Sequence, residues 1–144
     1  MPEPLAATHL ALTLRSELAS CETARLAVQA LLAKHRPSAK AVYQVEVVLE
    51  EALMNQIWHA FPDKLPNHPL QLRAEVANDT VALTFIDNGL PFNPLNIAPP
   101  KFPARLQDAT PGGLGIFLTQ KYAQSLVYER QGDENRLTVV LALR

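Results

Sequence analysis

The sequence predicts an α+β domain, in which helices and antiparallel strands occur in the same chain. Short segments with an apolar residue at every second position indicate five strands, four of which form two hairpins. Three segments with helical periodicity are distributed among these strands. The length of 144 residues is that of one domain, which we expect to span residues 1–144.

The chain begins with one strand and one helix. The alternation in "THLALTL" predicts a strand over residues 8–14, which we expect at an edge of the sheet. The alanine- and leucine-rich sequence from Glu22 to about His35 predicts a helix. Pro37 ends it, because proline lacks the N–H group that a helix interior requires.

The second helix is the longest element that the sequence predicts. Ser38 is a typical N-cap residue, and the helical sequence pattern continues to about Ala60. Glu51, Asn55 and His59 share one face of this helix. The apolar stripe predicted to face the core consists of Val42, Val45, Leu49, Ala52 and Leu53.

A hairpin follows, with predicted strands over residues 69–77 and 81–87 joined by a turn at Asn78 and Asp79. The alternation of the second strand places Asp87 on the inward face, if the strand continues that far. A buried carboxylate is unfavourable without a partner, so we expect one for Asp87.

The end of the chain predicts a helix over about 114–124 and a last hairpin with strands over 125–131 and 135–143. Gly132 lies in the turn between these two strands. The inward face of the final strand is expected to carry Leu137, Val139 and Leu141.

The segment 91–111 interrupts this regular pattern, because it holds six of the 12 prolines of the chain. Proline excludes a regular element there, and a loop of about twenty residues is usually a functional lid or a disordered segment. Gly89 precedes the segment and Gly112 follows it.

The first candidate functional motif is "EEALMNQIWHA", in which Glu51 and Asn55 are four residues apart on one helical face. An amide oxygen is a suitable ligand for Mg²⁺, and the carboxylate could accept a proton from an attacking hydroxyl. The same spacing also occurs on solvated helix faces.

The second motif is "DNGLPFNP", residues 87–94. It could be a simple turn in which glycine supplies a positive φ angle. Alternatively, the Asp87 carboxylate could accept a hydrogen bond from a ligand amine, while Gly89 allows a flat ring to approach the backbone.

The third motif is "GGLGIFLTQKYA", in which glycines lead into a helix. Free N–H groups and the positive end of the helix dipole favour phosphate, although a plain helix start has the same composition. No lysine followed by serine or threonine comes after the glycines, which excludes a Walker motif. Together the three motifs provide the groups that a nucleoside triphosphate requires.

These three motifs, with the third extended to "GGLGIFLTQKYAQSLVYERQGDENRLTVVLAL", resemble in order the nucleotide-binding boxes of the anti-sigma-factor serine/threonine kinases. That family belongs to the ATPase class of gyrase and the histidine kinases. The resemblance covers about residues 8–143. It implies a two-layer α/β sandwich, with a mostly antiparallel sheet covered on one side by helices.

The resemblance also implies roles for individual residues. Asn55 would coordinate the Mg²⁺ that bridges the phosphates of ATP or ADP, and Glu51 would be the general base. Asp87 would bind the adenine amino group, with Gly89 beneath the ring. The phosphate would accept hydrogen bonds from the backbone N–H groups of Gly112, Gly113, Leu114 and Gly115.

The sequence departs from the family pattern in two places. Pro111 stands where the family commonly has glutamate, and the lid is unusually rich in proline, which puts lid closure and turnover in question. Lys101 and Arg105, the cations of the lid, could meet a γ-phosphate or could be solvated. His59 matches the sequence pattern of the family at this position. We interpret it as structural support for its helix.

The implied activity is an ATP-dependent serine/threonine-protein kinase of a partner-switching system. Family members usually form homodimers, phosphorylate a small anti-anti-sigma protein, and sequester a sigma factor when that protein is phosphorylated. Two alternatives remain: a nucleotide-gated protein-binding module without kinase activity, and the catalytic half of a histidine kinase. The latter would need a helical hairpin for which the chain has no room.

The composition of the chain limits the kinds of binding partner and the cellular location that we expect. The formal net charge of −1 gives no whole-chain attraction to nucleic acid or to an anionic membrane. The apolar runs are shorter than the ~20 residues of a membrane span, and the first residues lack a signal-peptide pattern, so we expect a cytoplasmic protein. Cys21 is the single cysteine, which excludes an internal disulfide.

Overall fold

The computed structural model describes residues 8–96 and 113–144. Its strands are β1 (His9–Arg15), β2 (Pro69–Ala77), β3 (Thr80–Asp87), β4 (Ser125–Gln131) and β5 (Glu134–Ala142). Its α-helices are α1 (Ala19–Ala33), α2 (Ala39–Asn55) and α3 (Gly113–Tyr122). A one-turn π-helix, η1 (Gln56–Ala60), directly follows α2, and a 3-10 turn, η2 (Pro94–Asn96), follows β3.

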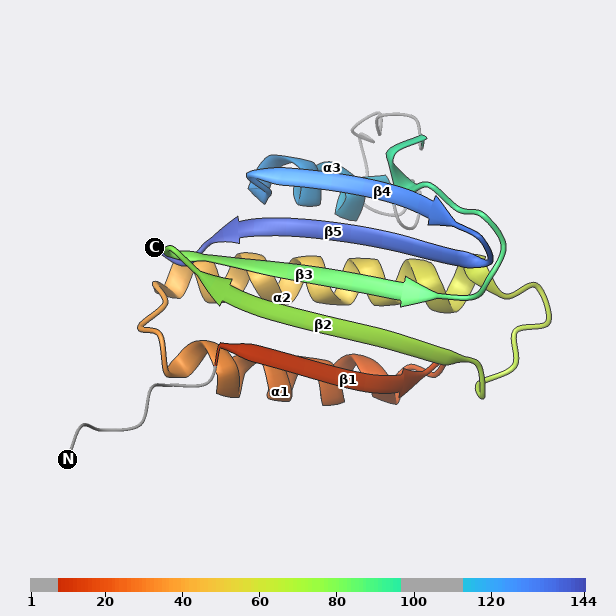
Figure 1. Cartoon of the computed structure of the whole chain (residues 1–144), viewed down its shortest axis with the longest axis horizontal. Coiled ribbons are helices and arrows are strands. Elements are labelled where there is room, and N and C mark those ends of the chain that lie inside the picture. The colour runs from red at the N-terminus through yellow and green to blue at the C-terminus, as the bar shows by residue number, and fades with distance from the viewer. Residues whose placement is uncertain (1–7, 97–112) are drawn as a thin grey trace, which may run out of the picture.

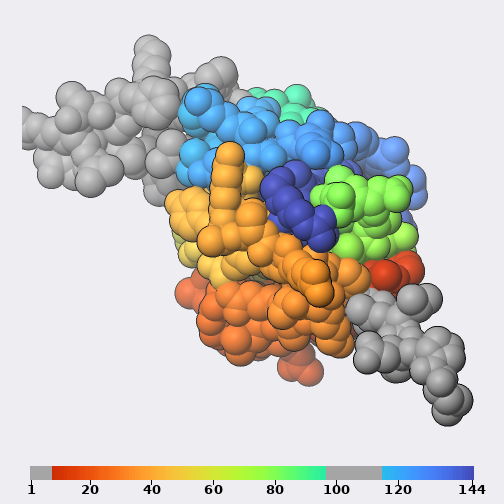
Figure 2. Space-filling view, turned by 90° about the vertical axis from the view of Figure 1, so that its left-hand side faces the viewer, coloured from red at the N-terminus to blue at the C-terminus, as the bar shows by residue number. Residues whose placement is uncertain are grey.

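The five strands form one antiparallel sheet in the order β1-β2-β3-β5-β4. The three helices lie on one side of this sheet (Figure 1). Seen from the end at which the β2–β3 turn lies, α1, α2 and α3 follow one another from bottom to top (Figure 2). The predicted α+β fold, with two layers and β1 at an edge, is therefore confirmed.

Both predicted hairpins are present, and their turns use the residue types that a left-handed backbone favours. Asn78 and Asp79 have φ angles of 51° and 63°, and Gly132 has a φ angle of 57°. Asparagine, aspartate and glycine adopt this conformation at the lowest cost, which explains why the two strand pairs reverse at these positions.

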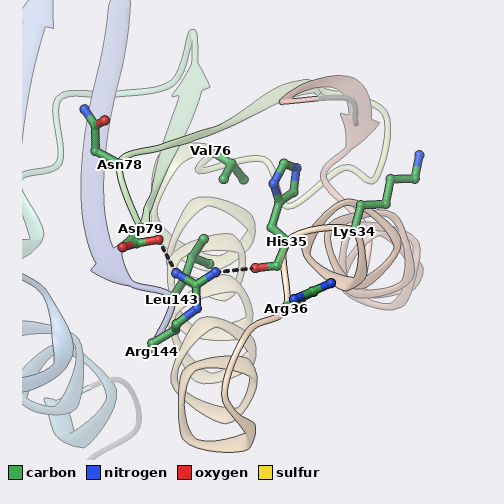
Figure 3. Close-up of a pocket in the computed structure, with 8 residues that line it drawn as sticks. All are labelled: Lys34, His35, Arg36, Val76, Asn78, Asp79, Leu143 and Arg144. Carbon is green, nitrogen blue, oxygen red and sulfur yellow. Dashed lines mark hydrogen bonds and ion pairs between the residues drawn. The ribbon is translucent and has the colours of Figure 1, made fainter. Parts of the chain in front are cut away.

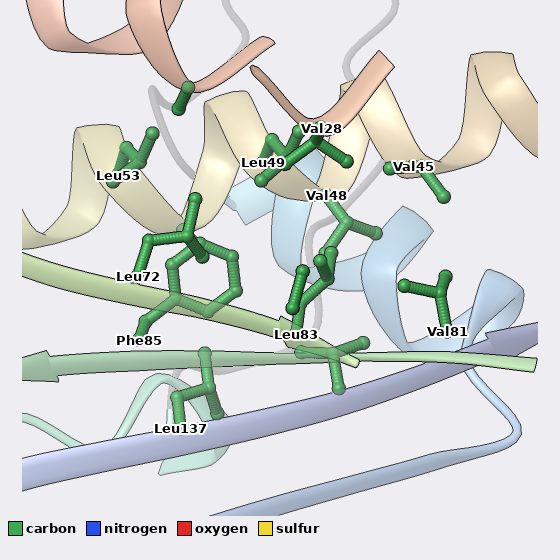
Figure 4. Packing of buried hydrophobic residues seen from close by; sticks show 14 of the residues in the cluster. Val28, Val45, Val48, Leu49, Leu53, Leu72, Val81, Leu83, Phe85 and Leu137 are labelled. Atoms are coloured by element: carbon green, nitrogen blue, oxygen red, sulfur yellow. The ribbon is translucent and has the colours of Figure 1, made fainter. Parts of the chain in front are cut away.

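The hydrophobic core lies between the sheet and the helices (Figure 4). Leu72, Leu83 and Leu53 are fully buried there, and each such side chain contributes roughly 1.5–3 kcal/mol relative to exposure. The α2 stripe was predicted correctly at four positions, but Val42 is only half-buried, whereas Val48 is fully buried.

The ends of the helices differ from the predicted ones for local reasons. Helix α1 begins at Ala19, three residues before the predicted start, because the Ser20 hydroxyl donates to the carbonyl of Arg15 (2.6 Å) and joins the first turn to β1. Helix α3 ends at Tyr122, because the N–H of Gln124 already donates to Val140 in β5 (2.7 Å).

The predicted second helix is divided in two. Ser38 caps α2, with its hydroxyl accepting a hydrogen bond from the N–H of Ala41 (3.0 Å), as predicted. The α-helical part ends at Asn55, and η1 continues it to Ala60. Single π turns frequently occur at functional sites.

The segment 91–111 is described only in its first residues. Pro94–Asn96 form the turn η2, so the prediction that the segment contains no regular element is wrong for these three residues. Residues 97–111 lie outside the described part of the chain. Within residues 8–96 and 113–144, no helix is long and apolar enough to cross a membrane.

Candidate functional site: a helix end beside a strand end

The end of α2, which carries Asn55, and the end of β3, which carries Asp87, lie at the same end of the sheet. Strand β3 ends at Asp87, and α2 ends at Asn55, with η1 continuing toward the same side (Figure 1). A hydrogen bond joins the two elements, because Nε2 of Gln56 donates to Oδ2 of Asp87 (2.9 Å). The structure therefore brings together two residues that are 31 positions apart in sequence.

The Asp87 carboxylate is buried and accepts three hydrogen bonds. Its side chain faces the helices, as the strand alternation predicted, and the residue is 5% exposed. Oδ1 accepts from the N–H of Gly89 (2.8 Å) and from Nδ2 of Asn135 (2.9 Å), and Oδ2 accepts from Gln56. The expected partners exist, and they hold the carboxylate in one orientation.

Asn135 connects this carboxylate to the loop that follows it. Its Nδ2 also donates to the carbonyl of Leu90 (2.8 Å), and its Oδ1 accepts from the Tyr128 hydroxyl (2.5 Å). Nη1 of Arg130 donates to the Gly89 carbonyl (2.7 Å) and lies 3.3 Å from Oδ1 of Asn135. The β4–β5 hairpin thus fixes the backbone of the "DNG" turn.

Gly89 packs directly against η1. A Cβ atom at this position would overlap the carbonyl and side chain of Ala60, and the N–H of Leu90 donates to that same carbonyl (2.8 Å). Glycine is therefore required here for the contact between the turn and the helix. Its predicted place beneath an adenine ring stays a prediction.

Gly89→Ala should lower the free energy of unfolding by about 1–3 kcal/mol, because the added methyl group must displace η1. Denaturant unfolding followed by circular dichroism measures this change. The matched control is Gly132→Asn, since a Cβ at Gly132 meets no atom within 4 Å and asparagine tolerates the positive φ angle there. Equal stabilities of the two variants would contradict the close contact between Gly89 and Ala60.

Glu51 lies on α2 against the first turn of α3. A Cβ atom at Gly115 would overlap the Glu51 carboxylate, so the absence of a side chain on α3 makes the room that this carboxylate occupies. The helices also touch through Tyr43 and Tyr122, whose rings meet edge to face with centroids 6.5 Å apart. The predicted base is therefore a neighbour of Gly115, one of the predicted phosphate-binding residues.

Partial burial, and then the nearby carboxylate of Glu50, raise the pKa of Glu51 above the ordinary value of a glutamate. Both effects disfavour the charged form. A base with a raised pKa holds a proton more strongly, which suits proton transfer from a hydroxyl.

If Glu51 is the base, the rate of phosphoryl transfer should fall on acidification at a higher pH than an ordinary glutamate would give, because the raised pKa lets Glu51 take up its proton earlier. Glu50→Gln removes one cause of the raised pKa. It should move the acidic limb of the pH–rate profile, the range in which the rate falls with falling pH, to lower pH. The measurement is a pH–rate profile of both proteins. An unchanged limb in Glu50→Gln would contradict the assignment of the limb to Glu51.

Asn55 is buried at the C-terminal end of α2, with 4% of its surface exposed. Its Nδ2 atom has no hydrogen-bond partner, which is unusual for a buried amide. An amide can exchange its nitrogen and oxygen by turning about its last bond, so the side chain is free to present either atom to a ligand. This fits the role of a ligand to Mg²⁺, which commonly binds one or two protein oxygens together with substrate phosphates.

Clusters of three or more histidine, cysteine, aspartate or glutamate side chains that could hold a metal by themselves are absent from the described residues. His59, on the predicted face of Glu51 and Asn55, is exposed and stacks on Phe92, with ring centroids 4.8 Å apart. It therefore contacts the start of the lid segment. The interpretation of His59 as structural support for its helix stays a prediction.

The predicted phosphate-binding glycines are only partly described. Helix α3 begins at Gly113, so the backbone N–H groups of Gly113, Leu114 and Gly115 belong to its first turn. Such groups have no partner inside a helix. Gly112, Lys101, Arg105 and Pro111 lie outside the described residues, and their predicted roles stay predictions.

Two pockets lie at opposite ends of the sheet. A cleft of about 790 Å³ beside the "DNG" turn is lined by residues that include Gly89, Arg130 and Asp133. A pocket of about 370 Å³ at the β2–β3 turn contains Lys34 and Asp79, with Arg144 held between Asp79 and the His35 carbonyl (Figure 3). The second pocket is remote from Asp87, because the length of β3 separates them.

Sequence reasoning missed three residues of the site, namely Gln56, Arg130 and Asn135. The sequence held a signal for Asn135, because it lies on the same face of its strand as Leu137 and Val139. In the structure it is the register partner of Asp87. The position of Gln56 could not be found from helical periodicity, since the π turn begins at this residue.

Comparisons with known proteins find a matching family and a similar kinase. Residues 14–141 match the histidine kinase-like ATPase domain family. The serine/threonine-protein kinase BtrW of Bordetella bronchiseptica is 32% identical over 108 residues, which are 74% of this chain and 74% of BtrW.

Among solved structures, that of the RsbU and RsbW domains of Rv1364c from Mycobacterium tuberculosis has the same fold, with a TM-score of 0.68 over 95% of this chain at 14% identity. This chain spans 33% of that one. The chain therefore belongs to the histidine kinase-like ATPase domain family, and the similarity to BtrW confirms the predicted resemblance to the serine/threonine kinases within it.

Proposed function

We propose that this protein is a Mg²⁺-ATP-dependent serine/threonine-protein kinase and anti-sigma-type regulator. Its substrate would be a small anti-anti-sigma-like protein in a partner-switching system. The observation that carries the proposal is the position of the Glu51 carboxylate against the glycine start of α3, four residues from the buried Asn55. The similarity to the kinase BtrW supports the same reaction.

Each residue has one task in the proposed reaction. Glu51 takes the proton from the attacking hydroxyl, whose oxygen forms a bond to the γ-phosphorus while the bond to the β–γ bridging oxygen breaks. The first N–H groups of α3 bind phosphate oxygens. Asp87 fixes the adenine end. Mg²⁺, held by Asn55 and the phosphates, would neutralise phosphate charge.

Phosphoryl transfer needs positioning and charge neutralisation more than covalent chemistry, and the site supplies both. We further propose that the kinase works as a cytoplasmic homodimer and that a sigma factor is its second partner. Neither nucleic acid nor a membrane is needed for this function.

The test uses the small anti-anti-sigma-like proteins encoded in the same genome, each purified and incubated with the kinase and ATP. Mass spectrometry should show the gain of one phosphoryl group on a serine or threonine of one of them, dependent on Mg²⁺. If none gains phosphate while ATP binds normally, the kinase proposal fails.

The second candidate is a nucleotide-gated binding module without kinase activity. It would gain support from a partner that binds in the presence of nucleotide and is never phosphorylated. The partly buried carboxylate of Glu51 argues against it, because a module that performs no transfer has no use for a desolvated base.

A further inference from the structure

We infer that Gln56 is a second residue that binds the amino group of the base, beside Asp87, and that it makes the site selective for 6-aminopurine nucleotides over 6-oxopurine nucleotides. The inference rests on the proposed function, in which Asp87 lies at the base. It follows from the hydrogen-bonding capacity of the two side chains.

The orientation of the Gln56 amide is fixed by its partner. The residue is 8% exposed, and its Nε2 donates to Oδ2 of Asp87 at 2.9 Å. An ionised carboxylate oxygen can only accept, so the nitrogen of the amide must face it and the oxygen must point elsewhere. Unlike the amide of Asn55, this amide cannot exchange its two atoms without losing a hydrogen bond.

The Oε1 atom of Gln56 is buried and has no hydrogen-bond partner. Buried acceptors without a donor are rare and unfavourable in folded proteins. The neighbouring residue, Asn55, carries another unpaired polar atom, so two such atoms come from consecutive residues at the end of α2. This concentration indicates that groups from a ligand complete the hydrogen bonding here.

The lone pairs of Asp87 show which ligand group fits. Its Oδ1 accepts from Gly89 and Asn135, which occupies both acceptor positions of that atom. Its Oδ2 accepts from Gln56, which leaves one position. Asp87 can therefore accept only one of the two hydrogens of an amino group, and Oε1 of Gln56 is the adjacent acceptor for the other.

The same pair of acceptors disfavours a 6-oxopurine. A carbonyl oxygen at the position of the amino group would face Oδ2 and Oε1, neither of which can donate. A site whose buried polar groups lose their partners discriminates strongly between ligands of equal size. Adenine nucleotides are thus selected by two side chains, one from the strand and one from the π turn.

The experiment compares three nucleotides by calorimetry at a fixed Mg²⁺ concentration: ADP, purine riboside 5′-diphosphate, which has hydrogen in place of the amino group, and inosine diphosphate. Gln56→Met keeps the side-chain length and removes both polar atoms. It should weaken ADP binding roughly three- to tenfold, the effect of one hydrogen bond, and leave purine riboside diphosphate unchanged. The preference for ADP over inosine diphosphate should fall as well.

The control is Gln71→Met, the same substitution at an exposed position of β2, which should change none of the three affinities. A role of Gln56 only in the general fold of the site predicts equal losses for ADP and purine riboside diphosphate, and this result would overturn the inference. If the wild type binds ADP no better than purine riboside diphosphate, the inference is also wrong. Failure of the wild type to bind any of the three would contradict the proposed function and this inference together.

A measurement on the wild type covers the case in which Gln56→Met does not fold. The side-chain amide signals of Gln56 in a nitrogen–proton correlation spectrum should shift on addition of ADP and shift less with purine riboside diphosphate. Equal shifts with both nucleotides would show that Oε1 does not contact the amino group.

Discussion

Glu51→Gln should slow phosphoryl transfer by roughly two to four orders of magnitude, which is the usual contribution of a general base. The substitution keeps the size of the side chain and its place against Gly115 but removes its ability to take a proton. Nucleotide affinity should change little, since the proton is taken from the attacking hydroxyl rather than from ATP. The rate of phosphate transfer to the partner and the affinity for ADP are the two measurements.

The matched control is Glu50→Gln, assayed on the pH-independent plateau above the acidic fall of the pH–rate profiles of both proteins. Glu50 is exposed on the neighbouring face of α2, and its variant should retain the wild-type rate. If Glu51→Gln transfers phosphate as fast as this control, Glu51 is not the base, and positioning by the remaining residues carries the reaction.

Asp87→Asn should weaken adenine nucleotide binding by roughly ten- to a hundredfold, because hydrogen bonds to a charged acceptor are stronger than those to an amide. It should also destabilise the protein. Three donors converge on the carboxylate, and an asparagine amide can accept only on its oxygen, so at least one buried donor loses its partner at a cost of about 1–3 kcal/mol.

Calorimetry and denaturant unfolding separate these two effects. Asp133→Asn, at an exposed position in the turn before β5, is the control and should change neither quantity. Loss of stability with unchanged affinity would mean that Asp87 only maintains the fold of the turn. Partner binding that persists unchanged in Asp87→Asn would show that nucleotide does not gate the interaction.

The fold could be predicted from the sequence because its signals are local. The alternation of Leu70, Leu72, Ala74 and Val76 matches the alternating burial of β2 at every position. Ser38 marks the start of α2 by side-chain chemistry that needs no tertiary contact. The order of the strands in the sheet was not predicted, since periodicity alone does not determine which hairpin lies beside which.

A residue of the candidate site could be predicted only where a sequence motif, or the alternation of inward and outward positions along a strand, indicated its place. Asp87 was found by the alternation of β3, and Glu51 and Asn55 by their helical spacing. Gln56 was missed because its role depends on a hydrogen bond to a residue 31 positions away. The packing of Gly115 against Glu51 is likewise a contact between separate helices, to which local sequence patterns are blind.

The most direct test of the account is calorimetric titration of the protein with ATP and with ADP, in the presence and absence of Mg²⁺, repeated with Asn55→Ala. The account predicts that both nucleotides bind, that Mg²⁺ strengthens the binding of ATP, and that the variant loses this gain while retaining metal-free binding. Absence of binding by the wild type, or an equal gain from Mg²⁺ in the variant, would contradict the nucleotide site at the end of α2.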